Sequence, residues 1–509
     1  MRPANDAPIL KLYYTSDVHG HFFPTSYGDR EEKDMGLFQC AGQFEKDDIT
    51  LVLDGGDILQ GSAFTYYCQN VARSPGAIAD IMNRCGYDFV TVGNHDFNYG
   101  AGYLRQYLAA LNGACVCQNI CDAAGTPLFP PVIRTLKSGL RVGLVGIVTD
   151  YVNLWEAPEN LAGLCVTDPF AAAKEALEGI QAQCDITVCI YHGGYEREPL
   201  TGEAPAAATT ENIACRICEE LRFDILLTAH QHRSLPGQYL QGTYTLQLAE
   251  NAKEYAALTV HKSGAGYRIQ AQTRKAAGPC PLALQEAFAP VEARVQAWLD
   301  APVGSLPLAL LPESRLRMAA YGSPIADFFN QVQLHYSGAQ LSAVSLANEV
   351  NGFAQRVTRR DVIASYPYAN TLVVLRVSGA VLRAALERSA EYFTLDASGQ
   401  AAISPAFLHP KLEHYNYDFF VGAAYKFDIQ KPLGQRVTGL CVGGRPVQAS
   451  DSFTLCLNSY RACGSGGYPM YEGCPRLREI NIEMSELILR YFEEHPAVEL
   501  MPMQKGCLL

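Results

Sequence analysis

Long apolar runs are absent from this sequence. No stretch approaches the roughly 18–20 consecutive apolar residues that a membrane-spanning helix requires. The first twenty residues, MRPANDAPILKLYYTSDVHG, hold one short strand-like run in place of the apolar core of a signal peptide. We therefore expect a cytoplasmic protein with no membrane partner.

An excess of positive charge is also missing. The 40 basic side chains are outnumbered by 52 acidic ones, which gives a formal net charge of −12. A surface that wraps DNA or RNA needs clustered lysine and arginine, so we expect no nucleic-acid polymer as a partner. Small phosphorylated substrates stay compatible with this charge, because a metal ion can neutralise their charge locally.

Cysteine, in contrast, is abundant, with 17 residues. In a reducing cytosol these side chains are free and mostly buried thiols. A structural zinc site is the alternative, suggested by Cys115-Val-Cys117 and Cys215-Arg-Ile-Cys218. The second pair lies in a helix-like stretch and has no comparable pair to complete a set of four ligands. We therefore favour core cysteines.

Strand-like apolar runs recur through the first half of the chain, and each ends in a polar cluster. The runs stand in ILKLYYTSDVHG, ITLVLDGGDILQGS, DFVTVGNHDFN, CDITVCIYHGG and FDILLTAHQH, with helix-like stretches such as GAIADIMNRCG between them. Alternation of strands and helices predicts an α/β sheet. Open α/β sheets hold their sites at the carboxyl ends of the strands, so we expect the polar clusters to form one site.

The pattern changes in the middle of the chain. It stops near Ala271, and from about residue 303 turns with glycine, tyrosine and asparagine become frequent. Between these points, EAFAPVEARVQAWL predicts one amphipathic helix. A chain of 509 residues is long enough for two or more domains. We predict a first domain over 1–275, a connecting helix over 276–302 and a second domain over 303–509.

The polar clusters supply metal ligands. They hold carboxylate, imidazole and amide side chains and no thiolate: Asp17, His19, Asp57, Asn94, His192, His230 and His232. This mixture suits borderline divalent ions such as Mn²⁺, Zn²⁺, Co²⁺ or Fe²⁺ and singles out none of them. Seven ligands, one of them a bridging carboxylate, can hold two ions about 3.5–4 Å apart, which polarise a phosphoryl group and activate a water for attack on phosphorus.

Each cluster also has an interpretation without chemistry. An Asp-x-His can be a polar turn, an Asn-His-Asp can cap a helix, and His230 and His232 can be a surface pair. Ligand-type residues follow five strand ends in one half of the chain. This coincidence favours the metal site over the separate alternatives.

The motifs SDVHGH, DGGD, GNHD, YHGG and AHQH resemble, in this order, those of the calcineurin-like metallophosphoesterases. The last motif of that group usually begins with glycine, where this chain has Ala229. The chain as a whole resembles the 5'-nucleotidase family, in which a nucleotide-binding domain follows. The resemblance implies an α/β protein with a four-layer metallophosphoesterase β-sandwich and flanking helices, followed by a smaller α+β nucleotide-binding domain.

The resemblance also assigns roles by position. One ion would take Asp17, His19, Asp57 and His232, and the other would take Asp57, Asn94, His192 and His230, with Asp57 bridging. His95 would not be a ligand. The corresponding histidine of the family contacts the phosphate and stabilises the transition state, where charge acts strongly because the site is largely dehydrated.

Three stretches of the second half resemble parts of the family's nucleotide-binding domain: SPIADFFNQVQL, ASYPYANTLVVLRVSG and YRACGSGGYPMY. In relatives two aromatic rings clamp the base, and the matching positions here are Tyr368 and Tyr468. Stacking contributes about 1–3 kcal/mol per base and tolerates every base. The alternative is that both tyrosines pack in a core or an interface. Asn348 is a further candidate contact to the base, although the family's Gly-rich, Arg-ending motif is missing around it.

Asn98 distinguishes between branches of the family. In nucleotide monoesterases of the family, the residue three after the catalytic histidine is typically an Asp, which orients the imidazole and supports its positive charge. An Asn keeps the hydrogen bond and adds no charge. GNHDFNYG, HYNYDFFVGAAYKFDI and NSYRACGSGG resemble the branch that hydrolyses 2',3'-cyclic nucleotides and 3'-nucleotides. We therefore predict a dinuclear-metal phosphohydrolase of those nucleotides, with His95 and Asn98 as its catalytic residues.

Other functions stay open. A 5'-nucleotidase or UDP-sugar hydrolase would use the same chemistry. A non-catalytic nucleotide-binding protein is the alternative of another class, and the complete ligand set with His95 counts against it. A DNA nuclease would share the five motifs, but the acidic charge counts against it. The expected partners are nucleotide substrates, and the sequence carries no sign of an oligomeric state.

Overall fold

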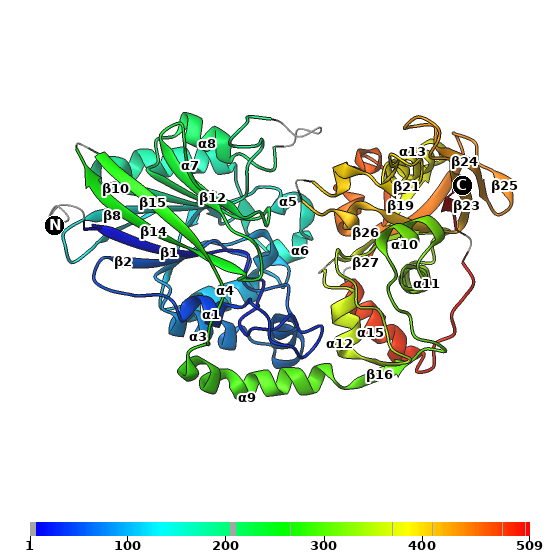
Figure 1. The fold of residues 1–509 in the computed structure, drawn as a ribbon, viewed down its shortest axis with the longest axis horizontal. Coiled ribbons are helices and arrows are strands. Elements are labelled where there is room, and N and C mark those ends of the chain that lie inside the picture. The colour runs from blue at the N-terminus through cyan, green and yellow to red at the C-terminus, as the bar shows by residue number, and fades with distance from the viewer. Residues whose placement is uncertain are drawn as a thin grey trace. The chain divides into compact units, whose positions relative to one another are not determined.

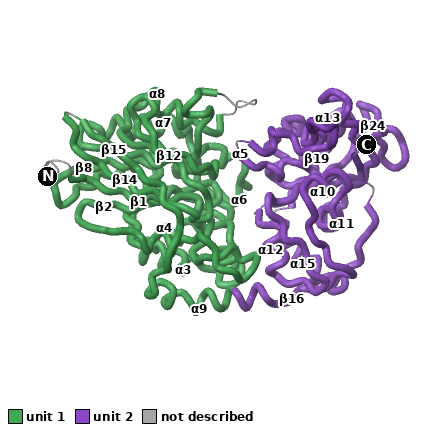
Figure 2. The backbone as a smooth tube through the Cα atoms, viewed as in Figure 1, with its two compact units in different colours: residues 1–295 green, residues 296–509 purple. Residues whose placement is uncertain are grey.

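The structure is a computed structural model, which describes residues 7–203, 210–264, 266–368, 370–409, 411–480, 482–503 and 505–508. The chain divides into two compact units, residues 1–295 and 296–509 (Figure 1, Figure 2). We describe each unit by itself.

The first unit is built on two six-stranded sheets, with the strand orders β15-β14-β1-β2-β3-β4 and β12-β13-β11-β10-β8-β7. The strands of the first sheet are β1 (Leu10–Thr15), β2 (Thr50–Asp54), β3 (Phe89–Val90), β4 (Ala114–Cys115), β14 (Glu254–Ser263) and β15 (Gly266–Lys275). Those of the second are β7 (Val132–Thr135), β8 (Arg141–Val148), β10 (Ile186–His192), β11 (Ile225–Thr228), β12 (Leu235–Leu240) and β13 (Thr243–Gln247). A small sheet joins β5 (Cys117–Cys121), β6 (Pro127–Phe129) and β9 (Cys165–Val166).

The central strands are buried on both faces. All seven residues of β10 are buried, which explains its mostly apolar sequence, ITVCIYH. Side chains of the two sheets meet in one core, where Leu12 and Leu53 of the first sheet join Val188 and Leu227 of the second. The two sheets therefore form a sandwich.

Helices cover the outer faces of the sandwich. The apolar sides of α7 (Pro169–Ile180) and α8 (Ala214–Glu220) pack on the second sheet. Asp168 caps α7 by accepting from the Ala171 amide at 2.6 Å, and Pro169 occupies the first turn. On the opposite side lie α1 (Leu37–Ala41), α3 (Gly76–Cys85) and α4 (Ala101–Ala110) (Figure 1). The predicted α/β fold with a four-layer sandwich is confirmed.

Short elements complete the first unit. They are α2 (Ala63–Tyr67), the π-helical turn Cys68–Ala72, the 3₁₀ turns Asn94–Phe97 and Gln181–Gln183, α5 (Val152–Trp155) and α6 (Pro158–Leu161). The division between the units falls inside α9 (Leu282–Leu299), the helix that follows β15. The finer domain limits predicted from the sequence stay a prediction.

The second unit has an α+β fold, as predicted. Its main sheet has the order β22-β17-β26-β19-β27, and a four-stranded sheet has the order β25-β24-β23-β28. These strands are β17 (Leu341–Ser345), β19 (Leu372–Ser378), β22 (Asp418–Val421), β23 (Ala423–Phe427), β24 (Val437–Val442), β25 (Arg445–Pro446), β26 (Ser452–Asn458), β27 (Arg476–Ile480) and β28 (Cys507–Leu508). Two-stranded sheets pair β16 (Pro302–Ser305) with β18 (Arg356–Thr358), and β20 (Phe393–Leu395) with β21 (Ala401–Ile403).

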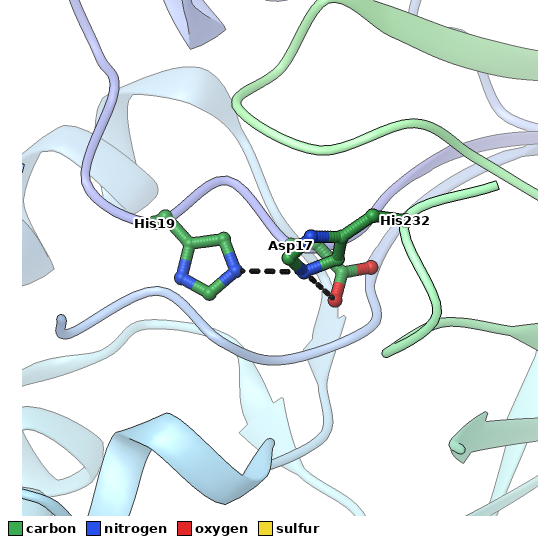
Figure 3. Close-up of side chains that lie close together, drawn as sticks. All are labelled: Asp17, His19 and His232. Atoms are coloured by element: carbon green, nitrogen blue, oxygen red, sulfur yellow. Dashed lines mark hydrogen bonds and ion pairs between the residues drawn. The ribbon is translucent and has the colours of Figure 1, made fainter. Parts of the chain in front are cut away.

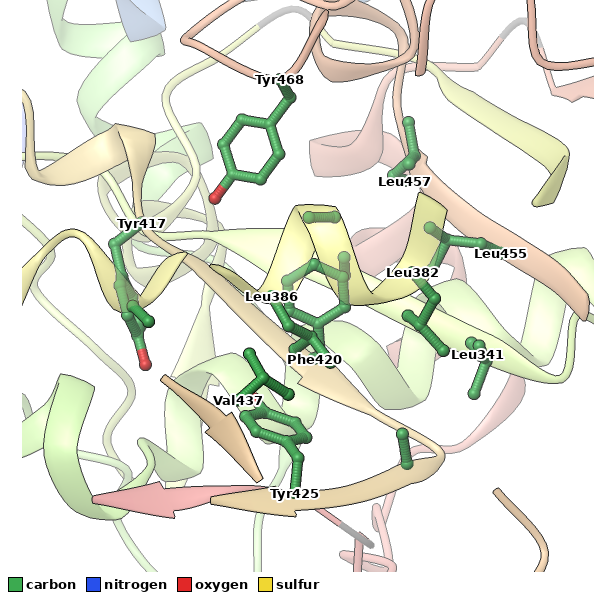
Figure 4. Packing of buried hydrophobic residues seen from close by; sticks show 14 of the residues in the cluster. Leu341, Leu382, Leu386, Tyr417, Phe420, Tyr425, Val437, Leu455, Leu457 and Tyr468 are labelled. Carbon is green, nitrogen blue, oxygen red and sulfur yellow. The ribbon is translucent and has the colours of Figure 1, made fainter. Parts of the chain in front are cut away.

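The helices of the second unit are α10 (Arg315–Tyr321), α11 (Pro324–Ser337), α12 (Arg359–Ser365), α13 (Gly379–Ala390), α14 (Ser459–Ala462) and α15 (Met484–Glu494), with 3₁₀ turns at Pro405–Phe407, His414–Asn416 and Pro469–Tyr471. Leu382 and Leu386 of α13 pack with Leu455 and Leu457 of β26 in its main core (Figure 4). Among the helices of the described residues, none is both long and apolar enough to cross a bilayer.

Candidate active site

The predicted metal ligands converge at one edge of the two sheets. Strands β1, β2 and β3 run parallel to one another, as do β8, β10, β11 and β13. Parallel strands place their carboxyl ends at the same edge of a sheet. Asp17, Asp57 and Asn94 follow β1, β2 and β3, His192 ends β10, and His230 follows β11.

One group of ligands contains Asp17, His19 and His232 (Figure 3). The Nε2 atoms of His19 and His232 lie 3.1 Å apart, and His232 Nε2 lies 3.5 Å from Asp17 Oδ1. His19 Nδ1 lies 2.9 Å from the Gln60 carbonyl, which can only accept a hydrogen bond. His19 therefore carries its proton on Nδ1 and turns the lone pair of Nε2 toward the group.

A second group joins Asp57, Asn94, His192 and His230. Asn94 Oδ1 lies 3.0 Å from His192 Nε2 and 2.9 Å from His230 Nδ1. Asp57 Oδ2 is 3.2 Å from His192 Nε2 and 3.8 Å from His19 Nε2. Because Asp57 approaches a histidine of each group, it lies where a bridging ligand would lie.

Hydrogen bonds behind the second group also orient its histidines. His192 donates from Nδ1 to the Gly55 carbonyl at 2.7 Å, and His230 presents Nε2 to Glu211 Oε1 at 2.8 Å. Acceptors on the far nitrogens leave His192 Nε2 and His230 Nδ1 for a metal ion, an arrangement typical of metal-binding histidines.

The site fits divalent cations. Asp17 and Asp57 are 0% and 1% exposed, and Oδ2 of each is buried without a hydrogen-bond partner. Buried anionic oxygens of this kind are costly unless a cation compensates them. Carboxylate, imidazole and amide donors match the borderline divalent ions expected from the sequence.

Burial and mutual attraction set the protonation of the ligands. Burial lowers the pKa of His192, but the neighbouring Asp57 carboxylate outweighs it and raises that pKa to about 10 when no cation is bound. Burial likewise opposes ionisation of Asp57, and His192 with His95 overcomes it and holds the Asp57 pKa well below its usual range. Burial raises the pKa of Asp17.

Backbone strain is concentrated in the ligands. Asp17, His19, Asp57, His230 and His232 have φ between 49° and 74°, in the left-handed region that glycine favours. They account for five of eleven such non-glycine residues in the described part of the chain. Strain of about 1–3 kcal/mol per residue gathers at functional sites, which supports the grouping of these five residues.

Asp96 and Gly93 join the two loops that carry Asp57 and Asn94. The Asp96 carboxylate accepts from the amides of Asp57, Ile58, Leu59 and Gly93 at 2.8–2.9 Å. At Gly93 an added Cβ would lie 2.2 Å from Asp57 Oδ1 and 2.6 Å from His192 Cε1. The glycine and the final aspartate of GNHD therefore serve the assembly of the site.

His95 and Asn98 lie together beside the candidate ligands. The His95 ring lies 5.4 Å from the His19 ring, and its Nδ1 is 2.8 Å from Asn98 Oδ1. The other side of the Asn98 amide donates to Glu156 Oε1. Burial raises the pKa of Glu156, an effect that the amide donors of Asn160 and Asn98 oppose.

Three residues of this site were missed in the sequence. Glu156 holds Asn98, Glu211 orients His230, and Trp155 stacks on His230 with ring centroids 5.5 Å apart. Glu156 and Trp155 belong to the short α5–α6 segment, and Glu211 precedes α8. None of them follows a strand or stands in a motif, so the sequence offers no pattern that could have identified them.

In the second unit, the structure does not expose Tyr468. Its side chain is 0% exposed and belongs to the core (Figure 4). Its hydroxyl lies 2.9 Å from Ser389 Oγ and donates to the Asn416 carbonyl at 3.2 Å. The ring also packs 4.2 Å from the guanidinium of Arg461, which forms a buried ion pair with Asp418. These contacts support the core alternative for Tyr468.

Tyr368 is half-buried, and so are two tyrosines near it. Burial raises the pKa of Tyr368, and the nearby Tyr415 and Tyr460 hydroxyls raise it further. Asn348 lies in the same unit, where it donates from Nδ2 to the Leu412 carbonyl at 2.7 Å. Its Oδ1 is buried without a hydrogen-bond partner.

Comparison with known proteins gives matches over both units. Residues 10–234 match the family described as calcineurin-like phosphoesterase, and residues 308–473 match the C-terminal domain of 5'-nucleotidases. A candidate 5'-nucleotidase from Staphylococcus aureus, solved in complex with alpha-ketoglutarate, is 30% identical to this chain, with a TM-score of 0.90. The similarity covers 98% of this chain and 99% of that one.

Curated relatives are more distant. A 2',3'-cyclic-nucleotide 2'-phosphodiesterase/3'-nucleotidase from Haemophilus influenzae is 25% identical over 90% of this chain and 80% of its own length. The trifunctional nucleotide phosphoesterase protein YfkN of Bacillus subtilis is 22% identical over 96% of this chain. The chain spans 38% of the length of that protein.

Proposed function

The chain belongs to the 5'-nucleotidase family and is a hydrolase of phosphoric esters, and from that premise we propose that it hydrolyses 2',3'-cyclic nucleotides and 3'-nucleotides. The observation that carries the proposal is the hydrogen bond from His95 to an amide, Asn98, beside the converging metal ligands. The name of the Haemophilus influenzae relative supports the same substrates.

We propose that the site holds two divalent ions. One would be bound by Asp17, His19, Asp57 and His232, and the other by Asp57, Asn94, His192 and His230. Bound there, divalent ions supply Lewis acidity to the phosphoryl group and to the attacking water.

The remaining chemistry falls to His95. With Nδ1 bonded to Asn98, the ring is left with Nε2 for a substrate oxygen. When Nε2 also carries a proton, its N–H donates to the phosphate and to the departing oxygen and stabilises the charge that develops there in the transition state.

We propose that the second unit binds the base through Tyr368. The burial of Tyr468 makes Tyr460 the better candidate for the second ring, because Tyr460 is half-buried and near Tyr368. Asn348 Oδ1 would add one hydrogen bond to the base.

A 5'-nucleotidase or UDP-sugar hydrolase is the second candidate function. It is favoured by the description of the Staphylococcus aureus protein, to which this chain is 30% identical over nearly its full length. Purified protein loaded with Mn²⁺ and assayed side by side on 2',3'-cAMP, 3'-AMP, 5'-AMP and UDP-glucose separates the two. We expect the first two substrates to be preferred, and preference for either of the others would overturn the proposal.

A cytoplasmic location stays part of the proposal. None of the 17 cysteines, all of which lie in the described part of the chain, forms a disulfide, and most of them are buried. Burial raises the pKa of thiols such as Cys40, Cys85 and Cys189, which keeps them unreactive. Free buried thiols suit a reducing compartment.

A further inference from the structure

The contact with His95 does not by itself fix the orientation of the Asn98 side-chain amide. A carboxylate presents an acceptor on either side, whereas an amide presents oxygen on one side and an NH₂ group on the other. If the Asn98 amide turned over, its NH₂ group would face His95 Nδ1, and the histidine proton would move to Nε2. A hydrogen-bonding group next to Asn98 must therefore determine which side of the amide faces the histidine.

Glu156 fixes the orientation of the Asn98 amide. Its Oε1 accepts from Asn98 Nδ2, and an ionised carboxylate can only accept, so the amide oxygen is left for His95 Nδ1 at 2.8 Å. The His95 proton is thereby held on Nδ1, and the lone pair of Nε2 is left to bind the proton that the ring presents to the substrate. We propose that Glu156 is a positioning residue that fixes the Asn98 amide and, through it, the tautomer of His95, an inference that rests on the proposed function of the site.

Asn160 holds Glu156 from the other side. Its Nδ2 donates to Glu156 Oε2 at 2.8 Å and to the Asn98 carbonyl at 3.1 Å. Both carboxylate oxygens of Glu156 thus accept from amides. Glu156 follows α5, and Asn160 lies on α6, so one short segment clamps the Asn98 side chain and backbone.

Glu156 also supplies a negative charge near His95, which an Asp at position 98 supplies in the monoesterase pattern. In the monoesterase pattern an acid contacts the histidine directly, whereas here the acid stands one hydrogen bond further away, behind an amide. Charge-assisted hydrogen bonds are about twice as strong as neutral ones, so the anion holds the amide in place more firmly than a neutral partner would.

The arrangement predicts that Asn98→Asp alone is harmful. It would set the new carboxylate against Glu156, with two acceptors and two like charges at hydrogen-bond distance. Glu156→Gln has the same shape as the native side chain but can donate as well as accept. With its oxygen turned to Asn160 and its NH₂ group to Asn98, it would turn the Asn98 amide over.

Combining the two changes should restore the chain of hydrogen bonds. In Asn98→Asp with Glu156→Gln, the glutamine accepts from Asn160 and donates to the new aspartate, which accepts from His95 Nδ1. Each donor again meets an acceptor, and the charge moves one residue closer to the histidine.

The experiment measures kcat and KM for 2',3'-cAMP, metal content and melting temperature in the two single variants and the double variant. Glu159→Gln, a change of the same kind at an exposed position of α6, is the matched control. We expect Glu156→Gln to lower kcat about 10–100-fold, as loss of a group behind a functional residue typically does. KM, bound metal and melting temperature of Glu156→Gln should stay close to wild type. The kcat of the double variant should be at least tenfold higher than that of Asn98→Asp alone.

A spectroscopic readout separates this inference from the function itself. Nitrogen-15 NMR of the His95 ring should report a proton on Nδ1 in wild type and in the double variant, and on Nε2 in Glu156→Gln. A Glu156→Gln variant with the wild-type tautomer and the kcat of the Glu159→Gln control would overturn the inference, as would a double variant no better than Asn98→Asp alone. If wild-type protein hydrolysed none of the nucleotides, the proposed function would fail. The NMR measurement of the His95 tautomer would still test the role of Glu156.

Discussion

Replacing Asp57 with asparagine removes one charge from the centre of the site and little else. Asp57 Oδ1 accepts from the His95 amide at 2.7 Å, and Oδ2 lies 3.2 Å from His192 Nε2. An asparagine can keep the first contact with its oxygen and turn its NH₂ group toward Nε2 of a neutral His192. His192 still donates from Nδ1 to Gly55, so each polar group keeps a partner and the fold should survive.

The loss of charge is what should matter. At 3.2 Å, and at an effective dielectric constant of about 20, one pair of unit charges interacts by about 5 kcal/mol. A neutral side chain forfeits interactions of that size with each cation that it would bridge. If about 4 kcal/mol of transition-state stabilisation is lost, turnover falls about 1,000-fold.

The assay is kcat for 2',3'-cAMP, with bound metal counted by mass spectrometry and the fold followed by circular dichroism. Asp54→Asn is the matched control from the same DGGD motif. Asp54 bonds to Thr15 and to the Gly56 amide, and burial raises its pKa to about 8, so near pH 7 it is largely neutral already. Asp57→Asn protein that kept more than a tenth of wild-type turnover with its metal bound would refute the bridging assignment.

Four further predictions follow from the same contacts. Tyr368→Ala should raise KM for nucleotides about 5–150-fold and leave KM for a small aryl phosphodiester unchanged. Tyr468→Ala should instead lower the free energy of unfolding by about 3–5 kcal/mol, because it empties a core position. Equal effects of the two changes on KM would contradict this division. Removing divalent ions with a chelator should lower the melting temperature, because ions that bind only the folded site stabilise the folded state, and Mn²⁺ should restore it; a melting temperature that does not change with the chelator would count against the site. Because Asp57 raises the pKa of His192 to about 10 in the metal-free protein, an ion must displace a proton, so metal affinity should rise between about pH 6 and pH 9; calorimetry that finds no pH dependence would refute this linkage. Protein isolated under alkylating conditions should carry 17 reduced cysteines, and several disulfides would contradict a reducing compartment.

Much of the candidate metal site could be predicted because its candidate ligands follow strands. An apolar run that ends in a polar cluster is a local pattern, and parallel strands bring such clusters to one edge. Asp17, Asp57 and Asn94 follow three neighbouring strands of one sheet, and His192 ends a central strand of the other. The two-layer arrangement of these sheets followed from the resemblance to a known family, because periodicity alone does not say which sheets pack together.

The contacts behind the ligands could not be predicted in this way. Glu156 reaches Asn98 across 58 residues of sequence, and Glu211 reaches His230 from the turn before α8. Such partners depend on tertiary packing, and neither residue stands in a periodic pattern. Tyr468 is a different case, since its motif predicts a base clamp while the structure turns its ring toward Ser389 and Arg461 in the core.

The comparison of substrates tests the central claim most directly. Purified protein loaded with Mn²⁺ is assayed for kcat/KM on 2',3'-cAMP, 3'-AMP, 5'-AMP and UDP-glucose under one set of conditions. The proposed function, which rests on Asn98 in the place of an acid beside His95, predicts the highest values for 2',3'-cAMP and 3'-AMP. A higher value for 5'-AMP or UDP-glucose would contradict the account, and hydrolysis of none of the four would contradict a nucleotide phosphohydrolase altogether.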